Sequence, residues 1–318
     1  MKALAIRGST VAVTGGCGFI GSHLVEALLG AGAAGVRVID DLRSGTEANL
    51  AAMRSDPRLA LHRLDLGTAP AVDALAGCDA VVHLAAVKHH PSRNDPERLM
   101  ATNVEASRRL FARAVELGVG KIVFASSLYV YGTGRPGPFG EDDPLLAETL
   151  YGASKICGES LLRAATAGTA TRSAALRYFF VYGPRLYRHH YAAALVPRTL
   201  ERIAAGRPPE VFGDGRQTFD YVYVDDAVAA TLAAIEHPGT GRAYNVCSGR
   251  GVTVLEVVET LLDLAGSDLE PVFGPADETA GTVRTGRPER MIEELGITPR
   301  VPLAEGLRRS LEWWRARS

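Results

Sequence analysis

A short apolar run passes directly into a glycine-rich turn in the segment Val11-Ala12-Val13-Thr14-Gly15-Gly16-Cys17-Gly18-Phe19-Ile20-Gly21. The apolar part predicts a buried strand, and the residues after the turn predict a helix with Leu24, Val25, Leu28 and Leu29 on one face. Such a turn lets backbone N–H groups approach a pyrophosphate, and the helix N-terminus adds positive potential. A purely structural glycine turn is the alternative, because three glycines alone have little specificity.

A second strand is predicted over residues 36–40, and it ends in Asp40, 19 positions after Gly21. Strand, turn, helix and second strand in this order are typical of a dinucleotide-binding unit. The position of Asp40 suits both hydroxyls of the adenosine ribose, and its charge would repel a 2′-phosphate. NAD is therefore favoured over NADP, although Arg43 lies close in the sequence. Asp65, at the end of the third predicted strand, is expected to contact adenine rather than only to end the strand.

Strand-like and helical patterns alternate through the first 180 residues. Further strands are predicted over residues 59–64, 80–84, 121–125 and 174–178, with helices over 97–117 and 152–167. Near-continuous apolar strands joined by helical crossovers predict an α/β fold with a Rossmann-type doubly wound parallel sheet. Its ligands are expected at the carboxyl ends of the strands.

The pattern changes after about Phe180, where helices dominate and Pro and Gly become frequent. Thr253 and Glu256 form a capping-box pattern before another helix. Residues 220–224 and 243–246 look like strands that rejoin the large sheet or its margin. We therefore expect two interleaved domains. They are an NAD-binding Rossmann domain over 1–178, rejoined by about 220–247, and a smaller, mostly helical substrate-binding domain over 179–219 and 248–318.

The composition excludes several classes of protein. The chain has 318 residues, of which 47% are hydrophobic and 22% charged, as in ordinary soluble proteins. Its net charge of -1 provides no basic footprint for nucleic acid. The four cysteines lie far apart and show no metal-ligand spacing, and no membrane span or signal-peptide core is present. We therefore expect a cytoplasmic protein with reduced thiols, and no metal, membrane or nucleic-acid partner.

The segment Tyr151-Gly152-Ala153-Ser154-Lys155 places a tyrosine and a lysine four positions apart on one face of a predicted helix. A lysine ammonium beside a phenol lowers the pKa of the phenol, so the phenolic oxygen can act as a base near neutral pH. A YxxxK pattern is common by chance. Here, however, a strand upstream ends in Ser126-Ser127, and a hydroxyl at that edge could bind the same substrate oxygen.

Together these motifs resemble the extended short-chain dehydrogenase/reductases, within the NAD-dependent epimerase/dehydratase family, and especially their UDP-glucose 4-epimerase-like branch. The resemblance covers nearly the whole chain. It rests on the glycine turn, YGASK, and further motifs at His83-Leu84-Ala85-Ala86, Ser127 with Tyr131-Gly132, Arg177-Tyr178-Phe179, Tyr182-Gly183-Pro184, Gly213-Asp214-Gly215, Tyr223-Val224-Asp225-Asp226 and Leu295-Gly296.

The resemblance implies that Ser127 holds the reacting hydroxyl, Tyr151 takes its proton, and Lys155 also holds the nicotinamide ribose. The cofactor contacts expected from the residues and the resemblance together are Gly15, Gly18, Phe19, Ile20, Gly21, Asp40, Asp65, Leu66, Leu84, Ala85, Ala86, Lys88, Asn103, Tyr151, Lys155 and Tyr178. The expected substrate contacts are Lys88, Ser127, Tyr151, Phe180, Arg216, Arg284 and Arg287. His83, on an apolar strand, is expected to be structural.

The resemblance also favours one reaction. A 4-epimerase oxidises the C4 hydroxyl, lets the 4-keto sugar turn over, and reduces it on the other face with no net change of NAD. The related 4,6-dehydratases carry an Asp-Glu pair after the catalytic hydroxyl residue, and UDP-glucuronate decarboxylases place a Glu there. This chain has Leu128 and Tyr129 at those positions, which demotes both reactions.

The residues at the positions that usually bind the nucleotide diphosphate differ from the family pattern. Phe180 stands where the family usually has Asn, Phe219 where it usually has Arg, and Thr279 where a third phosphate-binding Arg is expected. Arg284 and Arg287, in the segment over residues 282–290, are the strongest replacements, since an Arg fork suits phosphate oxygens.

The first hypothesis is therefore a nucleotide-sugar 4-epimerase that recycles NAD and forms a homodimer through the helices over 97–117 and 152–167. A second hypothesis, motivated by Phe180 and Phe219, is a dehydrogenase, reductase or dehydratase acting on another sugar-like alcohol. A non-catalytic NAD-binding protein is a distant third, because such a protein would not need Ser127, Tyr151 and Lys155 together.

Overall fold

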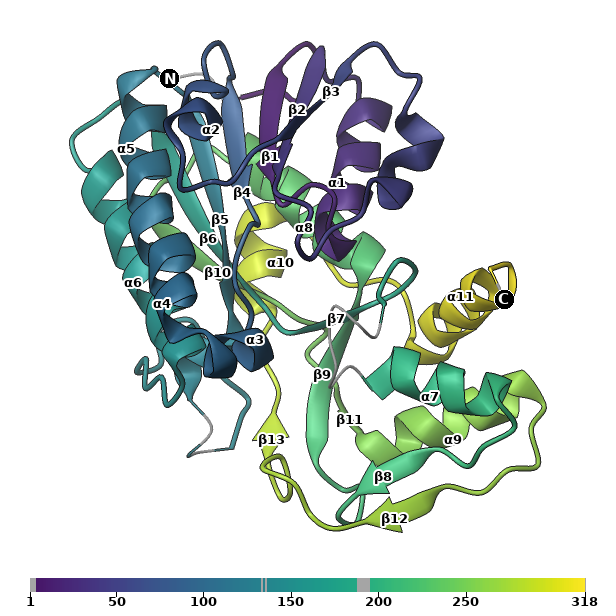
Figure 1. Ribbon diagram of the computed structural model, residues 1–318. Helices are drawn as coiled ribbons and strands as arrows, with labels where there is room; N and C mark the ends of the chain where they lie inside the picture. The colour runs from purple at the N-terminus through teal and green to yellow at the C-terminus, as the bar shows by residue number, and fades with distance from the viewer. Residues whose placement is uncertain (1–3, 133, 135, 188–194, 318) are drawn as a thin grey trace.

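A large, fully parallel sheet forms the centre of the protein in this computed structural model, which describes residues 4–132, 134, 136–187 and 195–317 (Figure 1). Its seven strands lie in the order β10-β6-β5-β4-β1-β2-β3, so the order reverses direction between β1 and β4. Adjacent strands pair in parallel throughout, as shown by Val11↔Val36 between β1 and β2 and by Val11↔Ala80 between β1 and β4. These strands span β1 Thr10–Thr14, β2 Gly35–Asp40, β3 Leu59–Arg63, β4 Ala80–His83, β5 Lys121–Ser127, β6 Arg172–Tyr178 and β10 Arg242–Val246.

Helices cover both faces of this sheet (Figure 1). Helices α5 (Ser107–Glu116) and α6 (Leu150–Thr166) pack together on one face, and α1 (Phe19–Gly30) and α8 (Val224–Glu236) pack together on the other. The shorter helical elements are η1 Glu47–Met53, α2 Ala69–Asp73, α3 His89–Asn94, α4 Pro96–Leu99, η2 Met100–Ala106, η3 Leu128–Tyr131 and α10 Glu289–Leu295. The Rossmann-type doubly wound fold predicted from the sequence is confirmed.

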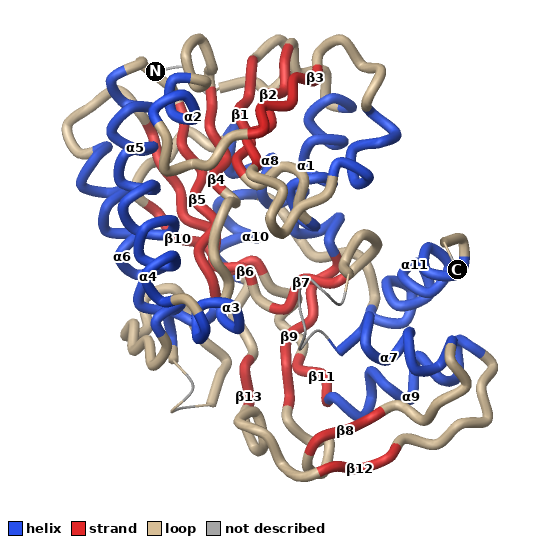
Figure 2. The backbone as a smooth tube through the Cα atoms, viewed as in Figure 1, coloured by secondary structure: helices blue, strands red, loops and turns tan. Residues whose placement is uncertain are grey.

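The remaining elements form a smaller unit at the carboxyl edge of the large sheet (Figure 2). Its main sheet has the order β11-β9-β13, with β7 also paired to β9, and a second sheet joins β12 to β8. The strands are β7 Phe180–Tyr182, β8 Glu210–Phe212, β9 Thr218–Tyr223, β11 Gly251–Thr253, β12 Val272–Gly274 and β13 Val283–Arg284. The helices are α7 Leu195–Ala204, α9 Val254–Ala265 and α11 Leu303–Arg315.

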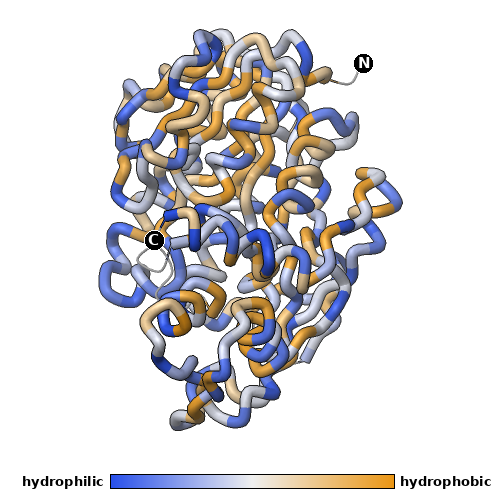
Figure 3. Tube along the Cα trace, turned by 90° about the vertical axis from the view of Figure 1, so that its right-hand side faces the viewer, coloured by the Kyte–Doolittle hydropathy of each residue, from blue (hydrophilic) through white to orange (hydrophobic). Residues whose placement is uncertain are grey.

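This arrangement corrects one expectation. Only β10 rejoins the large sheet, by pairing with β6, whereas the strand expected over residues 220–224 lies in the smaller unit as β9. One hydrophobic cluster nevertheless continues from Val13 and Val36 of the large sheet to Val258 and Leu307 of the smaller unit. Figure 3 shows hydrophobic stretches, in orange, in both the upper and the lower part of the molecule. The two units therefore share a core.

A second difference concerns the long helix expected over residues 97–117. It is divided into α4, a π-helical turn η2 and α5, with Asp95 accepting a hydrogen bond from the backbone N–H of Arg98 at its start. A π-turn inserts an extra residue into the helix and often occurs at functional sites. Asn103 lies in this turn. Among the described residues, no helix combines the length and the apolar character that crossing a membrane requires.

Candidate active site

The glycine turn between β1 and α1 is shaped by steric limits. Gly15 has φ +71°, and a Cβ placed on it would lie 2.8 Å from the backbone nitrogen of Ala85. A Cβ on Gly21 would lie only 2.2 Å from the carbonyl oxygen of Gly15. Helix α1 begins at Phe19 without a side-chain cap. No capping side chain therefore occupies the first backbone N–H groups of the helix, which point into the turn. This geometry fits a pyrophosphate bound by backbone N–H groups.

We expect Gly21→Ala to weaken NAD binding at least about tenfold, a loss of about 1.4 kcal/mol, because the added methyl group pushes α1 away from the turn. Titration calorimetry with NAD measures the change. Gly30→Ala is the matched control, since it lies in the same helix and a Cβ there meets nothing within 4 Å. Equal NAD affinity in the two variants would contradict this role for the turn.

Asp40 is held at the end of β2 with its carboxylate fixed by two backbone N–H groups. One carboxylate oxygen accepts from Cys17 at 2.9 Å and the other from Leu42 at 2.9 Å. Burial raises the pKa of Asp40, while the two backbone hydrogen bonds lower it. Arg43 turns toward acidic neighbours, with its Nε 3.2 Å from Asp41 and a terminal nitrogen 3.9 Å from Asp65. A carboxylate at this point suits ribose hydroxyls, and Arg43 is already engaged with carboxylates.

The loop after β4 faces this turn. The backbone N–H of Leu84 donates to the carbonyl of Thr14, and that of Ala85 donates to the Thr14 hydroxyl at 3.2 Å. Leu84, Ala85 and Ala86 are half-buried, whereas Leu66, after β3, is buried and Asp65 is exposed. The backbone of this loop therefore forms the second wall of the predicted cofactor groove.

Asn103 fastens that loop to the catalytic helix. Its amide oxygen accepts from the N–H of Val87 at 2.8 Å, and its amide nitrogen donates to the Val87 carbonyl and to the Ser154 hydroxyl, at 2.9 and 3.1 Å. These bonds engage both ends of the amide with protein groups. The structure therefore gives Asn103 a positioning role, beside its predicted cofactor contact.

The three predicted catalytic residues lie at the carboxyl edge of the large sheet. Ser127 is the last residue of β5, and its hydroxyl accepts from the N–H of Tyr129 at 3.4 Å. Tyr151 lies in the first turn of α6, which Thr149 caps by accepting from the N–H of Gly152 at 3.0 Å. Lys155 follows one turn later, with its Nζ 5.5 Å from the centre of the Tyr151 ring.

Burial lowers the pKa of Lys155 to about 7, with Glu159 raising it and Lys88 lowering it further. The Nζ of Lys155 donates to the carbonyl of Ala125 at 2.7 Å. Burial also lowers the pKa of Lys88 to about 7, and the charge of Asp40 opposes that shift. Lys88 thus acts electrostatically on both the predicted ribose-binding carboxylate and the catalytic lysine.

The Lys155 shift predicts a pH dependence of stability. The pKa of Lys155 falls from an ordinary 10.5 to about 7 on folding, so the unfolded chain binds the proton more tightly between these values. Lys155 therefore costs stability below pH 7, and its cost shrinks by up to about 1.4 kcal/mol per pH unit as the pH rises toward 10.5. Urea unfolding of the wild type and Lys155→Met should give free energies whose difference changes in this direction. Parallel pH curves would contradict the shift.

The structure also shows the surroundings of the predicted cofactor contact Tyr178 and of His83, which is expected to be structural. The hydroxyl of Tyr178, at the end of β6, shares a 2.6 Å hydrogen bond with Thr231 of α8, which fixes the position of its ring. His83 is held between Thr14 at 2.7 Å and Ser107 at 2.8 Å, and burial lowers its pKa to about 3. That environment agrees with the structural role expected for His83.

The substrate side contains an aromatic pair in place of the expected polar groups. Phe180 of β7 and Phe219 of β9 stack with ring centres 4.5 Å apart and an interplanar angle of 26°. Arg284 of β13 pairs in register with Phe219, and its guanidinium lies 5.8 Å from the Phe219 ring. A buried arginine from a neighbouring strand therefore stands beside the position where the family usually has one.

The other predicted substrate arginines are not brought into contact with the catalytic residues. The side chain of Arg216 is 85% exposed in the turn before β9, 3.9 Å from Asp214. Arg287 is exposed beside Gly140. Thr279 lies in another turn, bonded to Asp277. Arg216 and Arg287 stay predicted substrate contacts, and the turn before β9 directs the Arg216 side chain into solvent.

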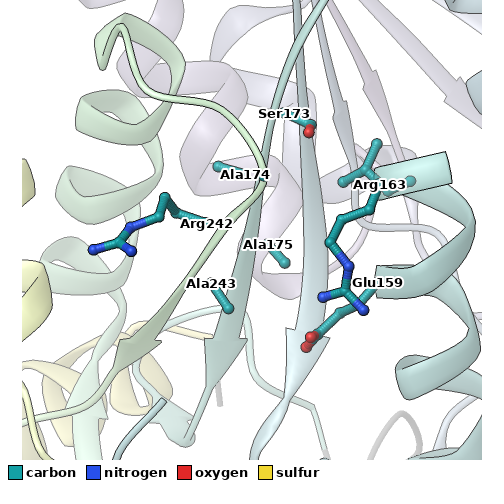
Figure 4. Close-up of a pocket in the computed structure, with 9 residues that line it drawn as sticks. Glu159, Arg163, Ser173, Ala174, Ala175, Arg242 and Ala243 are labelled. Atoms are coloured by element: carbon teal, nitrogen blue, oxygen red, sulfur yellow. The ribbon is translucent and has the colours of Figure 1, made fainter. Parts of the chain in front are cut away.

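A separate shallow hollow lies between α6 and the strands β6 and β10 (Figure 4). Arg163 and Arg242 flank it, and Ser173, Ala174 and Ala175 form part of its floor. None of the predicted catalytic, cofactor or substrate residues lines it. The candidate active site is instead the region between the carboxyl edge of the large sheet and the smaller unit.

Sequence reasoning did not find two groups near this site. In the sequence Tyr129 is only a position that lacks the dehydratase carboxylate, whereas in the structure it contacts His89, Tyr151 and Arg284. Glu159, buried in α6, binds Ser126 beside the catalytic serine. A glutamate in the middle of an otherwise regular helix carries no signal of burial, so only the fold could reveal it.

Comparison with known proteins places the chain in a family. The model of the NAD dependent epimerase/dehydratase family matches residues 11–247. The chain is 35% identical to a dTDP-glucose 4,6-dehydratase of Streptomyces griseus over 95% of its own length and 93% of that protein. It is 36% identical to a UDP-glucose 4-epimerase of Mycolicibacterium smegmatis over 96% of its length and 98% of that protein.

Solved structures give the same result. The UDP-N-acetylglucosamine 4-epimerase of Methanobrevibacter ruminantium M1 matches with a TM-score of 0.93 at 30% identity, covering 98% of this chain and 100% of that one. The dTDP-glucose 4,6-dehydratase DesIV of Streptomyces venezuelae, solved with NAD bound, matches with a TM-score of 0.88 at 31% identity, covering 96% and 97%. The cofactor is NAD, and the chain belongs to the NAD-dependent epimerase/dehydratase family of nucleotide-sugar enzymes.

Proposed function

We propose that this chain is a nucleotide-sugar epimerase that inverts C4 through a transient 4-keto sugar. The relatives include both epimerases and dehydratases, so the reaction depends on this chain's own residues. The residues that support epimerisation are Ser127, Tyr151 and Lys155, because Ser127 ends β5 at the carboxyl edge of the sheet and Lys155 lies one turn after Tyr151 in α6. This set abstracts and returns one proton at a single hydroxyl.

Each of the three residues has a separate task in this proposal. The hydroxyl of Ser127 orients the C4 hydroxyl, and the phenolic oxygen of Tyr151 takes its proton and later gives it back. Lys155 holds positive charge beside that oxygen and favours its ionised form. Bound NAD supplies the hydride acceptor for the oxidation and the donor for the return step. The sugar must turn over between the two steps, so the pocket cannot grip every hydroxyl tightly.

The observation that carries the choice of reaction is the pair Leu128 and Tyr129. A 4,6-elimination needs a carboxylic acid to move the C5 proton, and family dehydratases carry an Asp-Glu pair at these two positions. Leu128 is buried among Val130 and Tyr131 and has no proton to transfer. Burial raises the pKa of Tyr129, while the charge of Arg284 and a hydrogen bond from it lower that pKa. A neutral phenol is a poor replacement for a carboxylate base.

The test is incubation of the purified protein with UDP-, GDP-, CDP- and dTDP-sugars, followed by mass spectrometry and proton NMR. A product of unchanged mass with an inverted coupling of the C4 proton is expected. A product lighter by one water would contradict the proposal and indicate a dehydratase. The same panel identifies the nucleotide.

A second candidate is net oxidation or reduction of another sugar-like alcohol. The Phe180–Phe219 stack favours it, since both positions lose the polar groups with which the family usually holds a diphosphate. Epimerisation leaves free NADH at its starting concentration, whereas net oxidation makes it accumulate with substrate. Absorbance at the NADH band during the same incubation distinguishes the two.

A homodimer built on α5 and α6 accompanies the proposal. These helices pack against each other on the outer side of the large sheet (Figure 1). Two such pairs from two protomers would form a four-helix interface with the two-fold symmetry common among homodimers. Size-exclusion chromatography with light scattering should give twice the mass of the chain, and a monomer would contradict the assembly.

A further inference from the structure

Three side chains from distant segments converge on the ring of Tyr129, at the start of η3. The ring of His89, from α3, lies 4.8 Å away between centroids. The guanidinium of Arg284, from β13, lies 5.8 Å from the same ring. The ring of Tyr151 meets it edge-on at 5.6 Å. Tyr129 is therefore the common neighbour of the catalytic tyrosine and two basic side chains.

Both basic side chains are buried and incompletely bonded. Arg284 is 5% exposed and His89 is 8% exposed. The Nε of Arg284 and the Nδ1 of His89 have no hydrogen-bond partner among the residues that the structure describes. A buried guanidinium without an anion is costly, because aromatic contacts replace only part of its lost hydration. Two such atoms beside one tyrosine indicate a site completed by a ligand.

The charge around this cluster is predominantly positive. Burial lowers the pKa of His89, and the charges of Arg93, His90 and Arg284 lower it further, while Glu278 raises it. Glu278 is shared, since it forms an ion pair with Arg93 and lies 3.8 Å from His89. Within the described residues, no carboxylate forms an ion pair with Arg284. The missing partner is therefore an anion.

The position of Tyr129 identifies which part of a sugar would meet the cluster. Ser127 and Tyr151 take the reacting C4 hydroxyl in the proposed function, and Tyr129 lies two residues beyond Ser127 at the same edge. Its ring contacts that of Tyr151 directly, so a group on the carbon next to C4 falls beside it. C4 is flanked by C3, which carries a hydroxyl, and by C5, which carries C6. In the family dehydratases the position of Tyr129 belongs to the Asp-Glu pair that acts at C5, so the group beside Tyr129 is the C6 substituent on C5. The cluster therefore faces the C6 end of the sugar rather than the nucleotide.

We propose that His89, Tyr129 and Arg284 bind a carboxylate at C6, so that the substrate is a nucleotide-linked uronic acid. This inference rests on the proposed function, because it takes C4 as the reacting carbon. A planar guanidinium binds a carboxylate through two parallel hydrogen bonds, and the imidazole and phenol supply further polar atoms. The aromatic faces of Tyr129 and Phe219, each 5.8 Å from the guanidinium, hold it in place for that contact.

The test compares acidic and neutral sugars in pairs, using Tyr151→Phe protein loaded with NAD, in which ligands should bind without turnover. UDP-glucuronate and UDP-glucose, with their dTDP, GDP and CDP counterparts, are titrated by calorimetry. The acidic member of the preferred pair should bind at least about tenfold more tightly. If no uronate binds more tightly than its neutral counterpart, the inference is overturned.

Arg284→Gln should remove this preference while leaving the affinity for the neutral sugar within about twofold. Arg284→Lys should retain only part of the preference, because lysine keeps the charge without the planar fork. Arg250→Gln is the matched control, since Arg250 is an exposed arginine paired with Glu256 in the same unit. An equal loss for UDP, UDP-glucose and UDP-glucuronate in Arg284→Gln would assign the guanidinium to the pyrophosphate and overturn the carboxylate site.

These outcomes separate the two proposals. Inversion of C4 in neutral sugars without a preference for uronates would contradict the carboxylate site and leave the epimerase standing. A preference for uronates without inversion of C4 in the wild type would contradict the epimerase and support the carboxylate site. The comparison of acidic and neutral sugars in Tyr151→Phe protein needs no change at Arg284, so it holds even if a substitution at Arg284 prevents folding.

Discussion

Replacing Tyr151 with Phe is expected to lower turnover by about 10²- to 10⁴-fold while the protein still folds and binds NAD. The change removes one hydroxyl in the first turn of α6, and Lys155 then has no phenolate to stabilise. Substrate affinity should change little, because the ring and its edge-on contact with Tyr129 remain. Single-turnover kinetics with the substrate identified from the nucleotide-sugar panel measure the effect.

Tyr187→Phe provides the matched control for this substitution. The ring of Tyr187 meets that of Trp313 of α11 edge-on, with centroids 5.3 Å apart, and Tyr187 lies outside the predicted catalytic set. It should keep wild-type turnover. Equal activity in Tyr151→Phe and the wild type would revive the hypothesis of a protein that binds NAD without catalysis.

The cofactor site could be predicted from the sequence because its determinants are local. Gly15, Gly21 and Asp40 all lie in the unit formed by β1, the glycine turn, α1 and β2. Within this unit, Gly15 has a positive φ and a Cβ on Gly21 would meet the carbonyl oxygen of Gly15. The predicted catalytic residues lie near one another for a similar reason. Ser127 ends a strand, and Tyr151 and Lys155 share one helix face, so the order of elements brings them together.

The partners of Tyr129 could not be predicted in this way. His89 and Arg284 are 195 positions apart in the sequence. Both can contact Tyr129 only because β13 pairs with β9, and β13 is a two-residue strand with no sequence signature of its own. The same pairing explains why residues 220–224 were expected in the wrong sheet. A short β-branched run predicts a strand, but its partner is set by the fold of the smaller unit.

The contact between Phe180 and Phe219 also depends on the tertiary structure. In the sequence, Phe180 and Phe219 are two separate positions at which the polar side chain usual in the family is replaced by phenylalanine. In the structure they stack on each other, so the two departures form one apolar contact, and the guanidinium of Arg284 lies 5.8 Å from the centre of the Phe219 ring. The loss of a donor at 219 and the burial of an arginine at 284 are therefore one rearrangement of the substrate wall.

Glu159→Gln is expected to destabilise the protein by about 3–5 kcal/mol, because it removes the only carboxylate bonded to a buried guanidinium within the described part of the chain. Arg177 donates from Nε and from one terminal nitrogen to the two oxygens of Glu159, at 2.9 and 2.8 Å. Both side chains are nearly inaccessible, at 3% and 1% exposure. Urea unfolding measures the loss, and Glu105→Gln, in an exposed pair with Arg108 and Arg109, should cost far less.

Glu159→Gln should also lower catalytic activity. Glu159 accepts a 2.6 Å hydrogen bond from Ser126, and successive residues of a strand point to opposite faces, so fixing Ser126 also fixes the direction of Ser127. Glu159→Gln should therefore lower turnover below the level explained by its unfolded fraction, with the loss in kcat exceeding that in KM. Wild-type kcat in the folded fraction would show that Glu159 stabilises the sheet without positioning the catalytic serine. A loss in both stability and kcat would show that one buried ion pair serves the core and the chemistry together.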